Sequence, residues 1–501
     1  MKKVKLIFVA FILVACFINK IQAQVQGAES YRPQFHFSPK KGWMNDPNGM
    51  IFLNGKYHLF FQHNPNATTW GPMHWGHAIS TDLVNWQEQK IALYPDSLGT
   101  IFSGSAVIDK NNTAGFGKNA LVAVFTHHDH KVEESKSGLP AQHQSLAYSM
   151  DEGKTWTKYS GNPVLRSPGL QAFRDPKVMW YEADKQWIMT LATGGSATFY
   201  ASKDLKSWNK VGEFGVGFGS PEGTWECPDL FSLPVNGGQK WVLLSSLSSG
   251  APNGGSGTQY FVGQFDGNTF TPDHKDVRWI DYGTDNYAGI TWSNTGERKI
   301  FIGWMNNWTY ANVIPEQGWR GAATIARDLN LKQVGNEFYL TSLPVKELNG
   351  MTGKTNVIKN IQVKGDYDLS AKIAAFNGKF QLELATVVDE SFSLQLGNRK
   401  GEMLIIGYDK ANNNFYMDRS KSGLVSIPNN FAKNIIAPRI AKGSPVSLKL
   451  LLDASSAELF ADEGLTVMTN TFFNSEPFNQ LYIKTNKPVT IQKLKYSGIK
   501  N

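Results

Sequence analysis

Short runs of alternating apolar and polar residues dominate the chain, and turn residues (Gly, Pro, Asn or Asp) lie near their ends. The clearest runs are KYHLFFQ (56–62), LVAVFTH (121–127), QWIMTLAT (186–193), KWVLLSSL (240–247) and RKIFIGWM (298–305). Alternation with a period of two is typical of β-strands, and no long amphipathic helical pattern lies between the runs. The pattern predicts an all-β protein.

An internal repeat divides the first two thirds of the chain. Its copies share a strand, a serine, an acidic turn and a closing tryptophan: AISTDLVNW (78–86), AYSMDEGKTW (147–156) and YASKDLKSW (200–208). The tryptophans recur at intervals of about 50 to 70 residues, which fits one four-stranded propeller blade per repeat. Three such copies also fit a large β-sandwich.

The composition and the strand pattern of the sequence change near residue 330. No tryptophan follows that point, although the chain contains 15. The later strands alternate regularly, as in FQLELATVV (380–388), SFSLQLG (391–397), VSLKLLLD (446–453) and SSAELFAD (455–462). We therefore predict a first β domain over 30–335 and an antiparallel β-sandwich over 345–501, joined by the stretch at 334–350.

The first 23 residues have the pattern of a secretory signal. A basic head, MKKVK, precedes the apolar run LIFVAFILVACFI and a short exit that ends at Ala23. Cleavage after Ala23 predicts a secreted or periplasmic protein. The segment LVAC also resembles a bacterial lipobox, in which Cys16 would be lipidated and would anchor a surface lipoprotein. Membrane contact is expected only through that lipid.

The net charge excludes a typical nucleic-acid-binding protein, and the cysteine content excludes a disulfide-stabilised one. The net charge is +8, but residues 1–23 hold four lysines and no acid, so their removal leaves about +4. A net charge this small does not indicate a nucleic-acid-binding protein. Cys16 and Cys227 are the two cysteines, so a mature chain that lacks the signal contains no internal disulfide.

Three acids share a local setting. Asp46 in WMNDPNG, Asp175 in FRDPK and Glu226 in WECPD each lie within two residues of a proline and within three residues of an aromatic residue. A single Asp-Pro is commonly a turn residue, but three such sites are harder to explain that way. Loops at one end of a propeller channel converge, and a carboxyl group among aromatic rings has a raised pKa, as a general acid requires.

Carboxylates that converge in a pocket lined by aromatic side chains are typical of enzymes that cleave glycosidic bonds. Other chemistries lack their motifs. THHDH (126–130) does not have the HExxH spacing of a zinc site and is expected to be a solvated loop. The glycine-rich stretches match no phosphate loop, and there is no GxSxG nucleophile elbow. We expect no cofactor and no metal.

A set of motifs in register resembles glycoside hydrolase family 32, the β-fructosidases, and most of all its levanases and exo-inulinases. The motifs are WMNDPNG, HWGHAISTDLVNW, FSGSAV, FRDPKV, WECPDLF, GWMNNWTYAN and WRGAATIARDL, with FYMDRSKSG (415–423) in the second domain. The resemblance runs from about Gln34 to the C-terminus. It implies a five-bladed β-propeller followed by a β-sandwich.

The resemblance also implies roles for the acids. Asp46 matches the nucleophile of a retaining mechanism and Glu226 matches the acid/base, while Asp175 and Arg174 match residues that hold the fructose hydroxyls. Further positions that match sugar-binding residues are Asn45, Gln62, Trp70, Phe102, Ser103 and Trp308. Cys227, beside Glu226, is expected either to tune the acid/base or simply to pack.

The implied activity is hydrolysis of β-fructosidic bonds in levan, inulin or fructooligosaccharides, and of sucrose as a further substrate, with release of fructose from non-reducing ends. An endo-levanase or a fructosyltransferase would carry the same acids and differ in the shape of the site beyond the pocket. A fructan-binding protein on a catalytically dead propeller would lack one of the acids, and none is missing here.

Overall fold

Nearly all regular structure in the described chain is β-strand, as the alternating pattern predicts. The computed structural model describes residues 30–500 apart from 316–317, 374–375, 377, 388 and 444. The predicted signal peptide and its lipobox alternative lie outside the described residues. No helix in the described part of the chain is long and apolar enough to cross a membrane.

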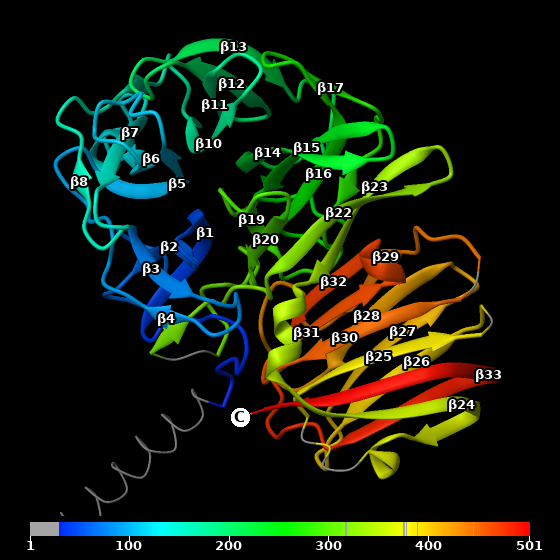
Figure 1. The fold of residues 1–501 in the computed structure, drawn as a ribbon. Helices are drawn as coiled ribbons and strands as arrows, with labels where there is room; N and C mark the ends of the chain where they lie inside the picture. Colours follow the sequence, from blue (N-terminus) through cyan, green and yellow to red (C-terminus); the bar gives the residue numbers. More distant parts are fainter. Residues whose placement is uncertain are drawn as a thin grey trace, which may run out of the picture.

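Five separate sheets form the N-terminal unit, each one blade of a propeller. Figure 1 looks along the propeller axis, which is surrounded by the five inner strands: β1 (Gly42–Leu53), β5 (Thr100–Asp109), β10 (Arg174–Tyr181), β14 (Trp225–Val235) and β19 (Tyr287–Thr291). Neighbouring inner strands contact one another in this order, and β19 contacts β1, which closes the ring. The predicted five-bladed propeller is confirmed.

The outer strands of each blade follow its inner strand. The first blade adds β2 (Lys56–Asn64), β3 (His74–Ser80) and β4 (Gln87–Glu88). The second adds β6 (Ala120–His128), β7 (Gln142–Ser149), β8 (Thr157–Lys158) and β9 (Leu165–Arg166). The third adds β11 (Gln186–Ala192), β12 (Ala197–Ser202) and β13 (Asn209–Phe214).

The last two blades lead to the second unit. The fourth blade adds β15 (Gly238–Leu247), β16 (Gly257–Phe265), β17 (Phe270–Pro272) and β18 (Arg278–Trp279). The fifth adds β20 (Lys299–Trp304), β22 (Arg327–Val334) and β23 (Glu337–Pro344). The short strand β21 (Trp319–Arg320) pairs in parallel with β1, so a late segment of the chain completes the first blade.

The sequence repeat forms the turn between the third and fourth strands of three blades. In the first copy, the backbone N–H groups of Val84 and Asn85 donate to the side chain of Asp82. Asp151 and Asp204 accept backbone N–H groups in the other two copies. An aspartate at the start of such a turn satisfies backbone donors that no strand partner reaches.

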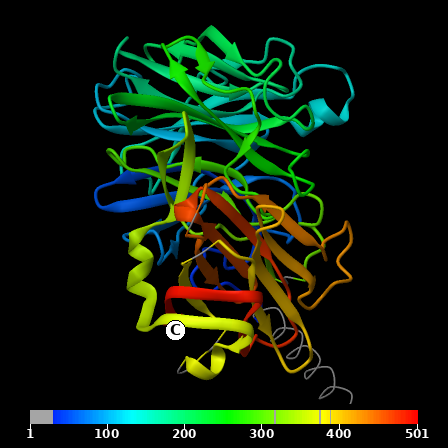
Figure 2. The same ribbon diagram turned by 90° about the vertical axis from the view of Figure 1, so that its right-hand side faces the viewer.

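A β-sandwich follows the short helix η1 (Lys346–Met351) and stands below the propeller in Figure 2. Its strands are β24 (Thr352–Asp368), β25 (Phe380–Thr386), β26 (Phe392–Gly397), β27 (Met403–Asp409), β28 (Asn414–Lys421), β29 (Asn434–Pro438), β30 (Ser447–Leu452), β31 (Ser456–Ala461), β32 (Thr466–Thr471) and β33 (Gln480–Ile499), with short helices η2 (Ser370–Lys372) and η3 (Asp462–Gly464). Strand β33 pairs with β26 at its start and with β25 at its end, so it joins the two halves around one core.

Buried ion pairs cross from the propeller to the sandwich. Arg419 of β28 donates to Asp285 across 2.9 Å. Arg327 of β22 donates to Asp281 across 2.9 Å and to Glu458 of β31 across 2.5 Å. All five side chains are buried, and a buried charge that loses its partner is strongly destabilising. These contacts therefore hold the two units in one relative position.

Candidate active site

Every inner strand of the propeller carries a β-bulge at the same level. The ladder between the first and second strands of each blade skips two residues of the inner strand: Asn45–Asp46, Phe102–Ser103, Asp175–Pro176, Cys227–Pro228 and Ala288–Gly289. A bulge bends the strand and redirects side chains away from the regular ladder. Five equivalent bulges thus bring polar side chains together at one end of the channel.

Three of these bulges use left-handed backbone conformations. The φ angles are +62° at Asp175, +44° at Cys227 and +52° at Ala288. That conformation costs a non-glycine residue about 1–2 kcal/mol, and such strain gathers at functional sites where the surroundings enforce it. Pro176 and Pro228 follow two of the strained residues, and their missing N–H groups leave no donor unpaired in the bulge.

A pocket of about 310 Å³ opens at this end of the channel. All ten site residues predicted from the sequence line it: Asn45, Asp46, Gln62, Trp70, Phe102, Ser103, Arg174, Asp175, Glu226 and Trp308. Three further lining residues were not predicted: His128, Glu133 and Gln142. The structure therefore brings together residues from four of the five inner strands, together with outer strands and loops.

The prediction of a solvated loop for THHDH is wrong. Strand β6 continues to His128, and the side chains of Thr126, His127 and His128 are buried. The chain then turns into the short helix α2 (His130–Glu134), which carries Glu133. In the sequence, the apolar run of β6 reaches as far as Thr126. The only available signal was that a strand can continue past its first polar residue.

Two of the side-chain donors that hold Asp46 are Asn45 and Ser103. The Nδ2 of Asn45 donates to its Oδ1 across 2.8 Å, and the hydroxyl of Ser103 donates to its Oδ2 across 3.1 Å. The indole N–H of Trp43 fixes the amide of Asn45 at 2.7 Å. Burial, followed by the negative charge of Glu226, raises the pKa of Asp46 to about 6, while the two donors favour its ionised form.

Glu226 is bound by Arg174. The Nη2 and Nε of Arg174 donate to Oε1 of Glu226 across 2.7 and 3.2 Å. Its other oxygen, Oε2, accepts no hydrogen bond from the described residues, so it is free to face a substrate. Burial raises the pKa of Glu226, and the guanidinium of Arg174 opposes that rise. A raised pKa is what a carboxylic acid needs in order to donate a proton near neutral pH.

Asp175 and Cys227 are tied together next to these acids. The backbone N–H of Cys227 donates to Oδ2 of Asp175 across 3.0 Å. Burial raises the pKa of Asp175 to about 6, with Arg174 acting against the rise and Asp46 adding to it. The Sγ of Cys227 lies 3.7 Å from Oδ2 of Asp46, so the thiol contacts that carboxyl group while it also packs in the apolar core.

Unpartnered polar groups and aromatic faces complete the pocket. The Nε2 of Gln62 is buried and has no hydrogen-bond partner among the described residues, which suits a donor that waits for a ligand. Trp308 packs against Trp43 and Trp304, with ring centroids 6.0 and 4.8 Å apart. Trp70, by contrast, is 39% exposed at the mouth. Rigid rings around hydrogen-bonding groups are typical of sugar sites.

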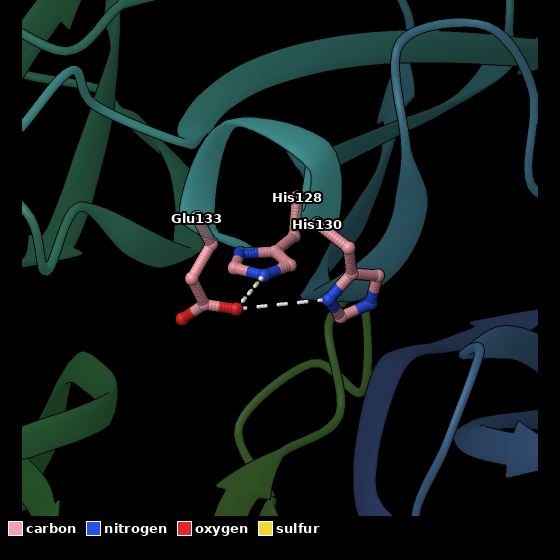
Figure 3. A group of neighbouring side chains, drawn as sticks. All are labelled: His128, His130 and Glu133. Atoms are coloured by element: carbon pink, nitrogen blue, oxygen red, sulfur yellow. Dashed lines mark hydrogen bonds and ion pairs between the residues drawn. The ribbon is translucent and has the colours of Figure 1, made fainter. Parts of the chain in front are cut away.

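One group of side chains at the mouth has the composition of a metal site. Ligand atoms of His128, His130 and Glu133 lie within 4.8 Å of one another (Figure 3). The carboxylates of Asp46, Asp175 and Glu226 do not belong to this group.

Two family models together cover almost the whole described chain. The glycosyl hydrolases family 32 N-terminal domain matches residues 36–342, and the family 32 C-terminal domain matches residues 345–497. The chain belongs to glycosyl hydrolase family 32.

Relatives of this family 32 chain include a levanase and exo-inulinases. It is 45% identical to a levanase of Bacillus subtilis over 460 residues, which covers 88% of this chain and 66% of the levanase, just under two thirds of that relative's length. It is 40% identical to an extracellular exo-inulinase of Aspergillus niger, covering 89% of this chain and 90% of the relative. The crystal structure of an exo-inulinase from Aspergillus awamori superposes with a TM-score of 0.85 at 36% identity, covering 94% of this chain and 98% of that one.

Proposed function

We propose that the chain is a retaining β-fructosidase that hydrolyses levan- and inulin-type fructans, and sucrose, by releasing fructose from non-reducing ends. The observation that carries the proposal is that Asp46, Asp175 and Glu226 line a single pocket of about 310 Å³. The names of the relatives, a levanase and an exo-inulinase, support fructan as the substrate class.

In the proposed mechanism, ionised Asp46 attacks the anomeric carbon of the terminal fructose while Glu226 donates its proton to the departing oxygen. The covalent fructosyl-enzyme is then hydrolysed by a water molecule that Glu226, now ionised, deprotonates. Asp175 accepts hydrogen bonds from fructose hydroxyls, and its negative charge stabilises the oxocarbenium-like transition state. Arg174, which donates to Glu226, stabilises the ionised acid/base between the two steps. None of these steps requires a metal or a cofactor, so dialysis against EDTA should leave the rate unchanged.

The exo mode follows from the small volume of the pocket. At about 310 Å³, it lies near the lower end of the range for ligand sites, which suits a terminal ring better than the middle of a polymer. A chain that enters only by its tip loses only its last unit.

Incubation of the purified protein with levan and with inulin, followed by chromatography of the products over time, tests the proposal. Free fructose should appear from the first minutes while the polymer shortens slowly. A ladder of oligosaccharides before fructose accumulates would indicate an endo-levanase instead. Products longer than the substrate would indicate a fructosyltransferase, and binding without any product would indicate a fructan-binding protein.

We also propose that the protein is exported, since the exo-inulinase relative is described as extracellular and the N-terminal segment has a signal pattern. Mass spectrometry of the mature N-terminus would distinguish cleavage after Ala23 from a lipid-modified Cys16.

A further inference from the structure

A chain of hydrogen bonds leads from Glu226 to the mouth of the pocket. Beyond the contact between Arg174 and Glu226, the Nη1 of Arg174 donates to Oε1 of Gln142 across 3.4 Å. The Nε2 of Gln142 lies 3.4 Å from Nδ1 of His128. The Nε2 of His128 lies 3.0 Å from Oε2 of Glu133. All five side chains line the same pocket.

The direction of this chain fixes the proton on His128. The backbone N–H of Phe173 also donates to Oε1 of Gln142, across 2.9 Å, so the NH₂ end of the amide faces His128. Nδ1 of His128 is then the acceptor, and its proton lies on Nε2, directed at Glu133 (Figure 3). The imidazole also stacks on Phe102, with ring centroids 4.4 Å apart and an interplanar angle of 4°. Glu133 is thus held by a rigid donor.

Glu133 keeps one oxygen available. Its side chain is 61% exposed, it lines the pocket, and its Oε1 accepts no hydrogen bond from the described residues. A carboxylate with one oxygen fixed by a buried histidine and the other open to the pocket is positioned to accept a hydroxyl group.

A metal ion fits this arrangement less well. Coordination by Nε2 of His128 requires a lone pair on that nitrogen, and the proton would have to move to Nδ1. There it would face the NH₂ group of Gln142, two donors against each other, whereas histidine ligands in metal sites normally donate their second N–H to an acceptor. The geometry therefore favours a neutral hydroxyl-bearing ligand.

We propose that Glu133 is a specificity-determining residue that binds the leaving sugar of the substrate through its Oε1. This inference rests on the proposed function: Glu226 protonates the oxygen that departs with the leaving sugar, so the wall that runs from Glu226 through Arg174 and His128 lies on the leaving-group side. Glu133, at the exposed end of this wall, accepts a hydrogen bond from a hydroxyl of that sugar.

Comparison of two kinds of substrate, with and without a sugar as the leaving group, tests the proposal. Methyl β-D-fructofuranoside has a leaving group without hydroxyls, whereas levanbiose and 1-kestose have sugar leaving groups. The Glu133→Gln variant should lose about five- to tenfold in kcat/KM on levanbiose or 1-kestose, mainly through KM, because the neutral amide oxygen that replaces the carboxylate accepts a weaker hydrogen bond from the sugar hydroxyl. Its kcat/KM on the methyl fructoside should equal that of the wild type. Glu134→Gln, one residue along the same exposed helix, is the control and should match the wild type on both.

The outcomes separate this inference from the proposed function. Equal losses on all substrates, or no loss on levanbiose and 1-kestose, would overturn the role of Glu133. Inhibition of the wild type by micromolar Zn²⁺ that disappears in Glu133→Gln would also overturn it, in favour of a metal site. If the wild type hydrolysed no fructoside at all, the proposed function itself would fail.

Discussion

The Nζ of Lys177 lies 3.1 Å from Oδ2 of Asp229, and the pair ties β10 to β14 a short way along the strands from the candidate catalytic residues. Arg174 contacts Glu226, and Asp175 accepts the backbone N–H of Cys227. All three contacts join residues 52 apart in the sequence. Two neighbouring blades therefore present the same bulge in the same register.

Replacement of Lys177 by methionine should destabilise the fold by about 3–5 kcal/mol, because the buried Asp229 would keep its bonds to Thr291 but lose its ion-pair partner, with only the charge of Lys299 left nearby. Urea denaturation measures the loss. The control is Lys185→Met, since Lys185 pairs with Glu182 on the surface and such pairs contribute about 0–1 kcal/mol. Equal stability of the Lys177→Met variant and the wild type would contradict a structural role for the buried pair.

The Asp46→Asn and Glu226→Gln variants should each lower kcat on sucrose about a thousandfold or more while the protein remains folded, because each loses a chemical role rather than packing. β-D-Fructofuranosyl fluoride separates the two roles. Its leaving group needs no proton, so Glu226→Gln should form the fructosyl-enzyme from it at a rate near that of the wild type, as a burst in stopped-flow measurements. Asp46→Asn should show no burst, and a burst from that variant would show that Asp46 is not the nucleophile.

The stereochemistry of transfer checks the retaining mechanism separately. With methanol as acceptor, the product should be methyl β-D-fructofuranoside, observed by NMR before mutarotation of free fructose obscures the result. An α-fructoside as the first product would require inversion and would remove the nucleophile from the mechanism.

The repeat and the local setting of the acids predicted a propeller and three of the pocket residues, Asp46, Asp175 and Glu226, whereas the number of blades and the other seven pocket residues came from the resemblance to family 32. The turn motif marks three blades because Asp82, Asp151 and Asp204 satisfy backbone donors locally. The fourth blade was not recognised, since its turn retains Asp266 but Phe270 replaces the tryptophan. Packing between blades needs a large ring at this position rather than one particular residue.

The missed pocket residues show where sequence reasoning stops. Glu133 and Gln142 become part of the site only because the segment after β6 folds back over the pocket and β7 begins beside it. Gln142 lies two residues after Pro140 but is not an acid, and Glu133 has no proline near it, so neither matched the pattern of the three acids. Their role depends on hydrogen bonds to His128 and Arg174, which are contacts made in space and leave no periodic signal in the chain.

The acidic limb of activity should follow the ionisation of Asp46 together with that of Asp175, whose pKa is also raised to about 6. Because the nucleophile must be ionised and its pKa is raised to about 6, kcat/KM should fall as the pH decreases below about 6. The Ser103→Ala variant removes a hydrogen bond that favours the carboxylate, so the pKa should rise further and the acidic limb should move to higher pH. The alkaline limb, set by Glu226, should stay in place. Because Ser103 donates to Asp46 and not to Asp175, an acidic limb that did not move would contradict a contribution of Asp46 to this limb.

The stability of the chain should decrease between about pH 6.5 and pH 9 because of His36. Its Nδ1 lies 2.7 Å from Asp453 and its Nε2 lies 2.6 Å from Glu458. Burial alone lowers the pKa of His36, but the two carboxylates outweigh burial and raise it to about 9. A pKa that is higher in the folded than in the unfolded chain stabilises the fold fully below the unfolded value of 6.5 and loses this effect as the pH rises through 9.

The shift of His36 corresponds to roughly 3 kcal/mol at most. Differential scanning fluorimetry from pH 6 to 9.5 should therefore show a falling midpoint for the wild type. The His36→Gln variant keeps a donor for one carboxylate but carries no charge at any pH. It should be less stable than the wild type at pH 6, and its midpoint should change less between pH 6.5 and 9. If both proteins lost stability in parallel over that range, groups other than His36 would be responsible, and His36 would not be the protonated link between Asp453 and Glu458.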